Sequence, residues 1–191
     1  MALNITQNTL HASGDPEGEL TLVPRHSSDA PELFALVERH RKALREWLTW
    51  IDATLTVGDA RRYAQFAEAQ LESRVAFDYL VRAGGKLVGA MGLHGIEWAG
   101  QSAQIGYWLS PEARGRGIAT RAARALVSHA FANLDLHRLE IRCVVENTRS
   151  RAVAERLGFR FEGTLSDAYL LHGAFRDIAL YAMTATGWRR R

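Results

Sequence analysis

The spacing of hydrophobic residues changes along the chain. Residues 1–19 are polar and indicate an arm, and residues 20–23 form a short apolar run that predicts a strand. From Asp29 onward, apolar residues recur at helical spacing, and a second such pattern begins near Thr56. Each start has an acidic residue three positions later, as in a capping box; after Thr56 this residue is Asp59. The first third of the chain therefore predicts an arm, a strand and two helices.

The middle of the chain alternates with a period of two. Residues 75–81 alternate between apolar and polar, and the pair Gly84-Gly85 separates them from a second run over residues 87–96. A turn at residues 99–101 leads into a third run over residues 103–109. Two glycines between alternating runs are typical of a β-hairpin. These residues predict an antiparallel meander of three strands.

Helices and strands then alternate to the end of the chain. The pattern predicts a helix over residues 117–133, a strand over residues 139–145 and a short helix capped by Gly158. Two final runs, residues 159–171 and 175–184, predict a hairpin. The element order is β-α-α-β-β-β-α-β-α-β-β, which predicts a mixed α+β domain.

Composition fits one globular domain. The chain has 191 residues, of which 47% are hydrophobic and 24% charged, so wholesale disorder is excluded. No apolar run reaches the ~18–20 residues of a membrane span, and the first residues lack a secretory signal pattern. We therefore expect a cytoplasmic protein without a membrane partner. The expected organisation is an arm over residues 1–19, a domain over residues 20–186 and a basic tail over residues 187–191.

Charge and cysteine content narrow the range of partners. The net charge is +3, and lysine occurs only at positions 42 and 86, so arginine supplies almost all positive charge. Arginine matches carboxylates and phosphates, although codon usage explains such a bias equally well. No aromatic RNA-binding or zinc-finger pattern is present, so we expect no direct nucleic-acid partner. Because Cys143 is the only cysteine, disulfides within the chain and multi-cysteine metal sites are excluded, and no metal is expected.

A glycine-rich loop between a predicted strand and a predicted helix is the strongest candidate for chemistry. The first N–H groups of a helix lack partners within it, and together with the helix dipole they favour a pyrophosphate. Glycines allow the backbone to approach phosphates closely. The candidate cofactor-binding residues here are Arg114, Gly115, Arg116, Gly117, Ile118, Ala119 and Thr120. The alternative is a plain turn before a helix, because so short a pattern also arises by chance.

Five segments resemble one known family. Arg114–Ala119 fits the R/Q-x-x-G-x-G/A acetyl-CoA loop of the GNAT N-acetyltransferases. The segments IGYWL (105–109), NTRS (147–150), LGFRFEG (157–163) and LYAM (180–183) resemble the RimJ/RimL branch, which acetylates protein N-termini, including those of ribosomal proteins. The resemblance implies a mostly antiparallel central sheet flanked by helices. It also implies acetyl-CoA as the cosubstrate, no metal, and a homodimer.

The resemblance further implies where parts of the site lie. The last meander strand would diverge from the strand after it, and pantetheine would pair with the backbone of Tyr107, Trp108 and Leu109. Asn147 and Ser150 would lie near the CoA arm and its sulfur, where a serine hydroxyl can donate a hydrogen bond to a developing thiolate. The alternative for Asn147 is to cap the short helix.

The general base is the least defined part. Members of the family commonly carry glutamate where this chain has Gln104, which cannot accept a proton. The nearest equivalents of a second family carboxylate are Asp167 and Tyr169. His94 is another candidate base, although a lone histidine on an apolar strand is more often only packed; Tyr169 and Tyr181 are alternative hydrogen-bond donors. An α-amine is about a tenth to a fifth neutral at pH 7, far more than a lysine, so a site without an obvious strong base suits an N-terminal amine.

Trp47 and Trp50 lie between the two early helices, which in this family wall the acceptor side of the cleft. They either anchor a core or line the acceptor site or a dimer contact. Nearby arginines would attract an acidic protein substrate: Arg41, Arg45, Arg61 and Arg62. The expected function is direct acetyl transfer, in a ternary complex, to the N-terminal α-amine of a protein such as a ribosomal protein. Acetylation of a small amine (a polyamine, amino acid or aminoglycoside) and a non-catalytic CoA-binding module are the alternatives.

Overall fold

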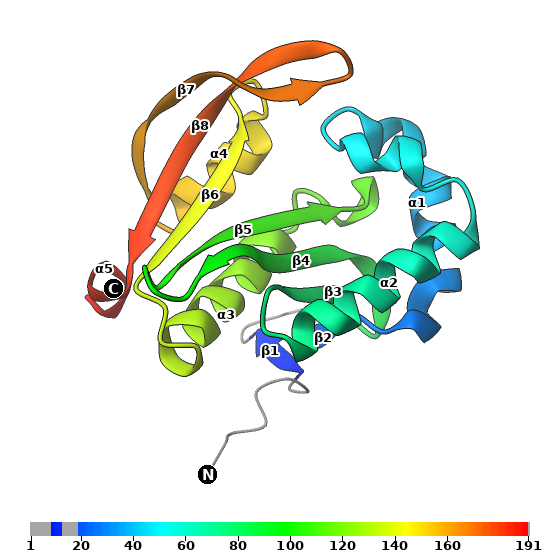
Figure 1. Ribbon diagram of the computed structural model, residues 1–191, viewed down its shortest axis with the longest axis horizontal. Helices are drawn as coiled ribbons and strands as arrows, with labels where there is room; N and C mark the ends of the chain where they lie inside the picture. Colours follow the sequence, from blue (N-terminus) through cyan, green and yellow to red (C-terminus); the bar gives the residue numbers. More distant parts are fainter. Residues whose placement is uncertain (1–8, 13–18, 191) are drawn as a thin grey trace.

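The fold is built on one eight-stranded sheet. The computed structural model describes residues 9–12 and 19–190. Within them the strand order is β1-β2-β3-β4-β5-β6-β8-β7, and only β5 and β6 pair in parallel (Figure 1). The strands are β1 (Leu10–Ala12), β2 (Leu20–Pro24), β3 (Phe77–Ala83), β4 (Lys86–Glu97), β5 (Ser102–Leu109), β6 (Arg138–Val144), β7 (Arg160–Leu171) and β8 (Ala174–Thr184). The α-helices are α1 (Ala30–Arg45), α2 (Val57–Glu72), α3 (Ile118–Asn133), α4 (Thr148–Arg156) and α5 (Ala185–Arg189).

The predicted α+β fold is confirmed, and two short elements add to it. Residues 10–12, inside the predicted arm, form β1 and pair antiparallel with β2 at the edge of the sheet. Residues 187–189 of the predicted tail belong to α5. The Trp188 ring of α5 lies 6.5 Å from the Phe131 ring of α3, so this helix packs against the domain.

The starts of α1 and α2 differ in how they are capped. The capping box predicted for α2 is present: Asp59 N donates to Thr56 Oγ1 at 3.1 Å, and Thr56 N donates to Asp59 Oδ2 at 2.8 Å. The box predicted at Asp29 is wrong. The Asp29 carboxylate accepts from His26 N at 3.0 Å and lies 3.4 Å from an Arg82 nitrogen, so it closes the preceding 3-10 turn (Ser27–Asp29) instead of capping α1.

Helices pack on both faces of the sheet. On one face, α3 inserts Ile118 and Leu126 among buried strand residues such as Met91 and Ile105. On the other face, α1 covers Leu80 and Ala90. In α2 the buried stripe consists of alanines (Ala60, Ala64 and Ala67). Tyr63 and Phe66 of the same helix are 49% and 57% exposed.

The parallel strands β5 and β6 separate halfway along their length. Their register runs only from Ser102↔Arg138 to Ile105↔Ile141. Beyond these four pairs, β5 continues along β4 to Leu109 and β6 continues along β8 to Val144 (Figure 1). The sheet therefore opens beside Gly106–Leu109, as the resemblance implied.

Candidate active site

The glycine-rich loop enters α3 through two left-handed residues. Gly115 has a φ of +77° and Gly117 a φ of +72°, a region that side chains with a Cβ rarely adopt. Gly117 is the N-cap of α3, and no side chain caps the helix there. A Cβ added at Gly117 would lie 3.2 Å from Arg121 Nη1. The loop thus keeps the start of a 16-residue helix clear of side-chain caps, which suits the diphosphate of CoA.

Arginines from two elements surround this loop. Arg114 Nε donates to Leu109 O at 3.3 Å, and Arg156 of α4 donates to Thr120 Oγ1 at 3.1 Å. Burial and the positive charge of Arg149 lower the pKa of Arg114, so the first turn of α4 adds charge on this side as well. Sequence reasoning missed Arg149 and Arg156. The sequence did contain a signal for these two arginines, because both lie on the helix that begins at the NTRS segment.

Ser150 and Tyr107 meet across the opening between β5 and α4. Asn147 Oδ1 accepts from Ser150 N at 3.1 Å, so the capping alternative for Asn147 describes the structure. Tyr107 OH donates to Ser150 O at 3.0 Å and lies 2.9 Å from Ser150 Oγ. Desolvation raises the pKa of the Tyr107 phenol, which therefore stays protonated and available as a donor. Desolvation raises the pKa of the buried Cys143 thiol, and the neighbouring Ser150 side chain opposes this shift.

A cavity of about 490 Å³ lies between the helices α1 and α2 and the sheet. Its lining includes Gly92 and Gly106, which are register partners on β4 and β5. A Cβ on Gly92 would lie 2.6 Å from Phe77 O and one on Gly106 would meet the His94 ring, so both positions require glycine. Tyr107 and Trp108 also line the cavity, so it reaches the stretch of β5 at which the sheet opens.

His94 projects into this cavity from β4. An added Cβ on Gly106 would lie 2.9 Å from His94 Cε1, so the imidazole lies over that glycine. The ring keeps solvent access through the cavity, but partial desolvation lowers its pKa; the Asp78 carboxylate opposes this shift and Arg142 reinforces it. The imidazole is therefore unprotonated at neutral pH, the form that accepts a proton.

The two tryptophans between α1 and α2 have different surroundings. Trp50 lines the cavity, and its ring centroid lies 5.9 Å from that of Trp108. Trp47 packs instead against Val144 and Leu171, and so lies in a small core beneath the β7–β8 hairpin. The structure thus places Trp50 in the wall of the cavity and Trp47 in a core.

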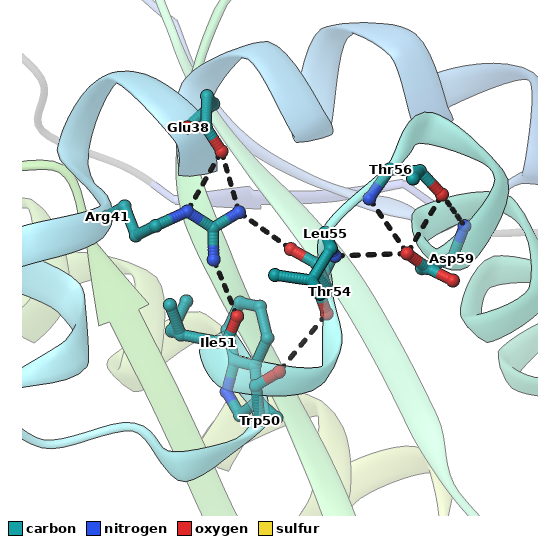
Figure 2. A network of polar contacts seen from close by, with 8 residues as sticks. All are labelled: Glu38, Arg41, Trp50, Ile51, Thr54, Leu55, Thr56 and Asp59. Carbon is teal, nitrogen blue, oxygen red and sulfur yellow. Dashed lines mark hydrogen bonds and ion pairs between the residues drawn. The ribbon is translucent and has the colours of Figure 1, made fainter.

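Arg41 holds the segment that carries Trp50. Figure 2 shows its guanidinium donating to the backbone carbonyls of Ile51 (2.6 Å) and Thr54 (2.7 Å) while it also pairs with Glu38. Among the other arginines expected to attract an acidic substrate, Arg45 pairs with Asp52, Arg62 pairs with Asp59, and Arg61 is exposed. The charge of three of the four is therefore compensated within the chain.

The remaining candidate residues lie away from the cavity lining. Asp167 is exposed in an irregular part of β7, where its N–H donates to Asp177. Tyr169 OH lies 3.3 Å from Thr49 Oγ1, and the buried Tyr181 donates to a carboxylate of α4. Gln104 lies against Gly95. Of the acid–base candidates, the structure brings only His94 into the described cavity lining.

No group of three or more His, Cys, Asp and Glu residues within residues 9–12 and 19–190 could hold a metal ion. In the same residues, no helix combines the length and apolar character needed to cross a membrane.

Known proteins resemble this chain in sequence and architecture. A family model described as an acetyltransferase (GNAT) domain matches residues 19–160. The ribosomal-protein-serine acetyltransferase of Escherichia coli (strain K12) is 31% identical over 172 residues, covering 81% of this chain and 93% of that protein.

Two solved structures superimpose closely. RimL, a ribosomal L7/L12 alpha-N-protein acetyltransferase in complex with coenzyme A, has a TM-score of 0.88 and 28% identity over 94% of this chain and 99% of that one. Mycobacterium smegmatis RimJ, in complex with a CoA-disulfide, has a TM-score of 0.85 and 30% identity over 94% of this chain and 87% of that one. The resemblance to RimJ/RimL-like proteins is thereby confirmed. The chain belongs to the GNAT family of acetyl-CoA-dependent N-acetyltransferases.

Proposed function

We propose that this enzyme acetylates the N-terminal α-amine of a protein, such as a ribosomal protein, while acetyl-CoA and the acceptor are bound together. The observation that carries the proposal is that the cavity and the opening between β5 and β6 meet at Gly106–Trp108. An acceptor in the cavity can then reach a thioester in the opening, so direct attack requires no covalent enzyme intermediate. The E. coli relative and RimL are both ribosomal-protein acetyltransferases by name, which supports a ribosomal-protein acceptor.

Each part of the site has a role in this reaction. Acetyl-CoA supplies the acetyl group as a thioester. The loop from Arg114 to Thr120, with Arg149 and Arg156, would hold the diphosphate, and the backbone of Tyr107–Leu109 would orient the pantetheine arm. Ser150 would turn its hydroxyl proton from Tyr107, whose oxygen lies 2.9 Å from Ser150 Oγ, to the departing sulfur. The other donors are fixed in place before the reaction, so little else reorganises when charge develops.

His94 accepts the proton of the incoming amine, directly or through a water molecule. An α-amine with a pKa of ~7.7–8.0 is already partly neutral near pH 7, so a base of modest strength is sufficient. A lysine with a pKa of ~10.4 would require a stronger base. The neutral imidazole in the cavity therefore supports an N-terminal acceptor over a lysine side chain.

Mass spectrometry tests the proposal. The enzyme is incubated with acetyl-CoA and three acceptors: a peptide with a free N-terminus, the same peptide with a blocked N-terminus and one lysine, and a polyamine. We expect one acetyl group on the free N-terminus only. Faster acetylation of the polyamine or the lysine would contradict the proposal. Ribosomal proteins from strains with and without this gene are then compared, which tests the acceptor and the cytoplasmic location of the enzyme. Sedimentation tests the predicted homodimer.

A further inference from the structure

Arg142 of β6 projects from the sheet face that carries the cavity. His94, Gln104 and Glu140 are register partners on β4, β5 and β6, so their side chains lie on one face of the sheet. Arg142 stands two residues beyond Glu140 and therefore projects from the same face. The register between β5 and β6 ends one residue before Arg142, where the two strands diverge (Figure 1). Arg142 is thus the first side chain on this face of β6 beside the opening.

Arg142 and His94 lie on opposite sides of the opening. The His94 ring lies over Gly106 of β5, beside which the sheet opens, whereas Arg142 belongs to the strand across the opening. Burial lowers the pKa of His94, and the positive charge of Arg142 lowers it further, so the two groups are within electrostatic range of each other. An amine that attacks a thioester in the opening from the cavity face would therefore approach between these two side chains.

Arg142 ends a chain of ion pairs that has one positive charge in excess. Its Nη2 lies 2.8 Å from Glu140, which also pairs with Arg138 at 2.9 Å. Glu162 is shared in turn between Arg138 at 2.5 Å and Arg160 at 2.9 Å. Three arginines thus share two carboxylates, so one positive charge of this chain is not compensated within it.

The guanidinium of Arg142 is open to a ligand. Its side chain is 42% exposed, whereas that of Glu140 is only 14% exposed. Nε and Nη2 both lie near the same oxygen, Glu140 Oε2, at 2.9 and 2.8 Å. A guanidinium carries five N–H donors in a planar fork, so the donors of Nη1 remain for a second acceptor, as far as the described residues are concerned. A carboxylate is the anion that this fork matches best within a protein chain.

We propose that Arg142 binds a carboxylate carried by the first or second residue of the acceptor peptide; this rests on the proposed function. The reacting α-amine lies between His94 and Arg142. An extended peptide advances ~3.3 Å per residue, so the third residue is already ~7 Å away along the chain and the first two supply the side chains within reach. The excess positive charge attracts a carboxylate and repels a cationic acceptor such as a polyamine. The enzyme therefore prefers acidic N-terminal segments.

Peptides that differ at one position test this preference. The reference peptide has a free N-terminus and asparagine at positions one, two and five, and each of three further peptides carries aspartate at one of these positions. With the wild-type enzyme we expect aspartate at position one or two to raise kcat/KM about tenfold, because a hydrogen bond between charged groups is gained. Aspartate at position five should change kcat/KM less than twofold, and lysine at the preferred position should lower it.

Variants of the arginine test whether it is the source of the preference. In Arg142→Gln, the aspartate and asparagine peptides should react within twofold of each other. In Arg142→Glu, the lysine peptide should become the better acceptor, because the charge at this position is reversed. Arg160→Gln is the matched control: it removes the 81% exposed arginine at the other end of the same chain of ion pairs and should keep the wild-type preference. The Kd for CoA of all three variants should stay within twofold of that of the wild type.

Salt provides a test that needs no variant. If Arg142→Glu fails to fold beside Glu140, an ionic strength of about 1 M, which shortens the Debye length to ~3 Å, should still reduce the wild-type preference for aspartate. Equal kcat/KM for the aspartate and asparagine peptides with an active wild-type enzyme, or a preference that persists in Arg142→Gln, would overturn the subsite alone. A wild-type enzyme that acetylates none of these peptides would overturn the proposed function.

Discussion

Single glycines shape the loop that we propose to bind CoA, because only glycine adopts this backbone conformation without strain. Gly117 combines a φ of +72° with a neighbour at 3.2 Å from its missing Cβ. In Gly117→Val, the β-branched side chain would force the loop to rearrange at the start of α3. We expect the Kd for CoA to rise more than tenfold, and the free energy of unfolding to fall by about 1–2 kcal/mol. Calorimetry with CoA and thermal unfolding measure the two effects.

Gly173→Val is the matched control for this variant. Gly173 has a φ of +83° in the β7–β8 turn, with no atom within 4 Å of an added Cβ. It should lose similar stability through backbone strain and keep its affinity for CoA. Equal CoA affinities for the two variants would show that Gly117 serves only the turn.

The protonation of His94 predicts how kcat/KM depends on pH. In the wild-type enzyme, two protons must be absent for reaction, one on the acceptor α-amine (pKa ~7.7–8.0) and one on His94, whose pKa lies below its usual 6.5. The logarithm of kcat/KM should therefore rise with a slope of two below the pKa of His94 and a slope of one between the two pKa values. In His94→Gln, we expect a slope of one throughout and a rate 10- to 100-fold lower at pH 7.

The pKa shift of His94 also affects stability. The unfolded chain binds this proton more readily than the folded chain, so the contribution of His94 to stability is complete above about pH 6.5 and declines as the pH falls. The free energy of unfolding must therefore be measured at every pH at which kcat/KM is measured. A slope of two that persists in the folded His94→Gln variant would assign the second proton to another group.

At the scale of elements, the segment between α1 and α2 depends on one side chain. Arg41 fixes the 3-10 turn (Thr49–Ala53) through its bonds to the carbonyls of Ile51 and Thr54, and thereby places Trp50 over Trp108. In Arg41→Met the two carbonyls lose a charged donor. We expect the acceptor KM to rise about 3- to 10-fold, stability to fall by about 1–3 kcal/mol, and the Kd for CoA to stay unchanged.

Arg62→Met provides the comparison for Arg41→Met. Arg62 pairs with Asp59 on the exposed side of α2, so its loss should change stability by less than about 1 kcal/mol and leave KM unchanged. Steady-state kinetics with the acceptor peptide distinguish the two. An unchanged KM in Arg41→Met would mean that Trp50 does not contact the acceptor.

Local signals explain how much of the fold the sequence predicts. The capping box of α2 needs two residues three positions apart, and the Gly84-Gly85 turn needs neighbours with positive φ, 54° and 76°. Both kinds of signal involve residues that are close together in the sequence. The strands, the main helices and the loop from Arg114 to Thr120 are therefore predictable. The three-residue β1 lacks a pattern of its own and exists through its pairing with β2.

Competition between distant residues explains what the sequence does not predict. Asp29 has the pattern of a helix cap, but Arg82, 53 positions away, pairs with its carboxylate. The pair of Arg25 and Asp78 in the cavity wall likewise joins the residue after β2 to β3, 53 positions away, and neither residue stands in a motif. Residues of a cavity wall are brought together by the sheet register, which a single sequence does not specify.

At the scale of the whole molecule, the sheet has two parts that touch at both ends of the opening. At one end are the four pairs between β5 and β6. At the other, the β7–β8 hairpin reaches the segment after α1 (Figure 1), where His172 Nε2 lies 2.5 Å from Arg45 O and Tyr169 lies beside Thr49. The opening is thus bounded on both sides, and under the proposed function this boundary would restrict how the pantetheine arm enters and leaves.

Trp47 is the apolar part of this second contact, since it packs against Val144, Leu171 and Ile178. In Trp47→Ala the hairpin loses its packing partner, so local opening should become more frequent. We expect faster hydrogen exchange over residues 165–177 and a several-fold faster dissociation of CoA, with little change in its association rate. Trp98→Ala, on the β4–β5 turn, removes a tryptophan of 38% exposure without touching the hairpin and should change neither rate. If CoA dissociates from Trp47→Ala as slowly as from the wild type while exchange at the hairpin increases, the arm does not leave past the hairpin, and the exit lies on the side of α3.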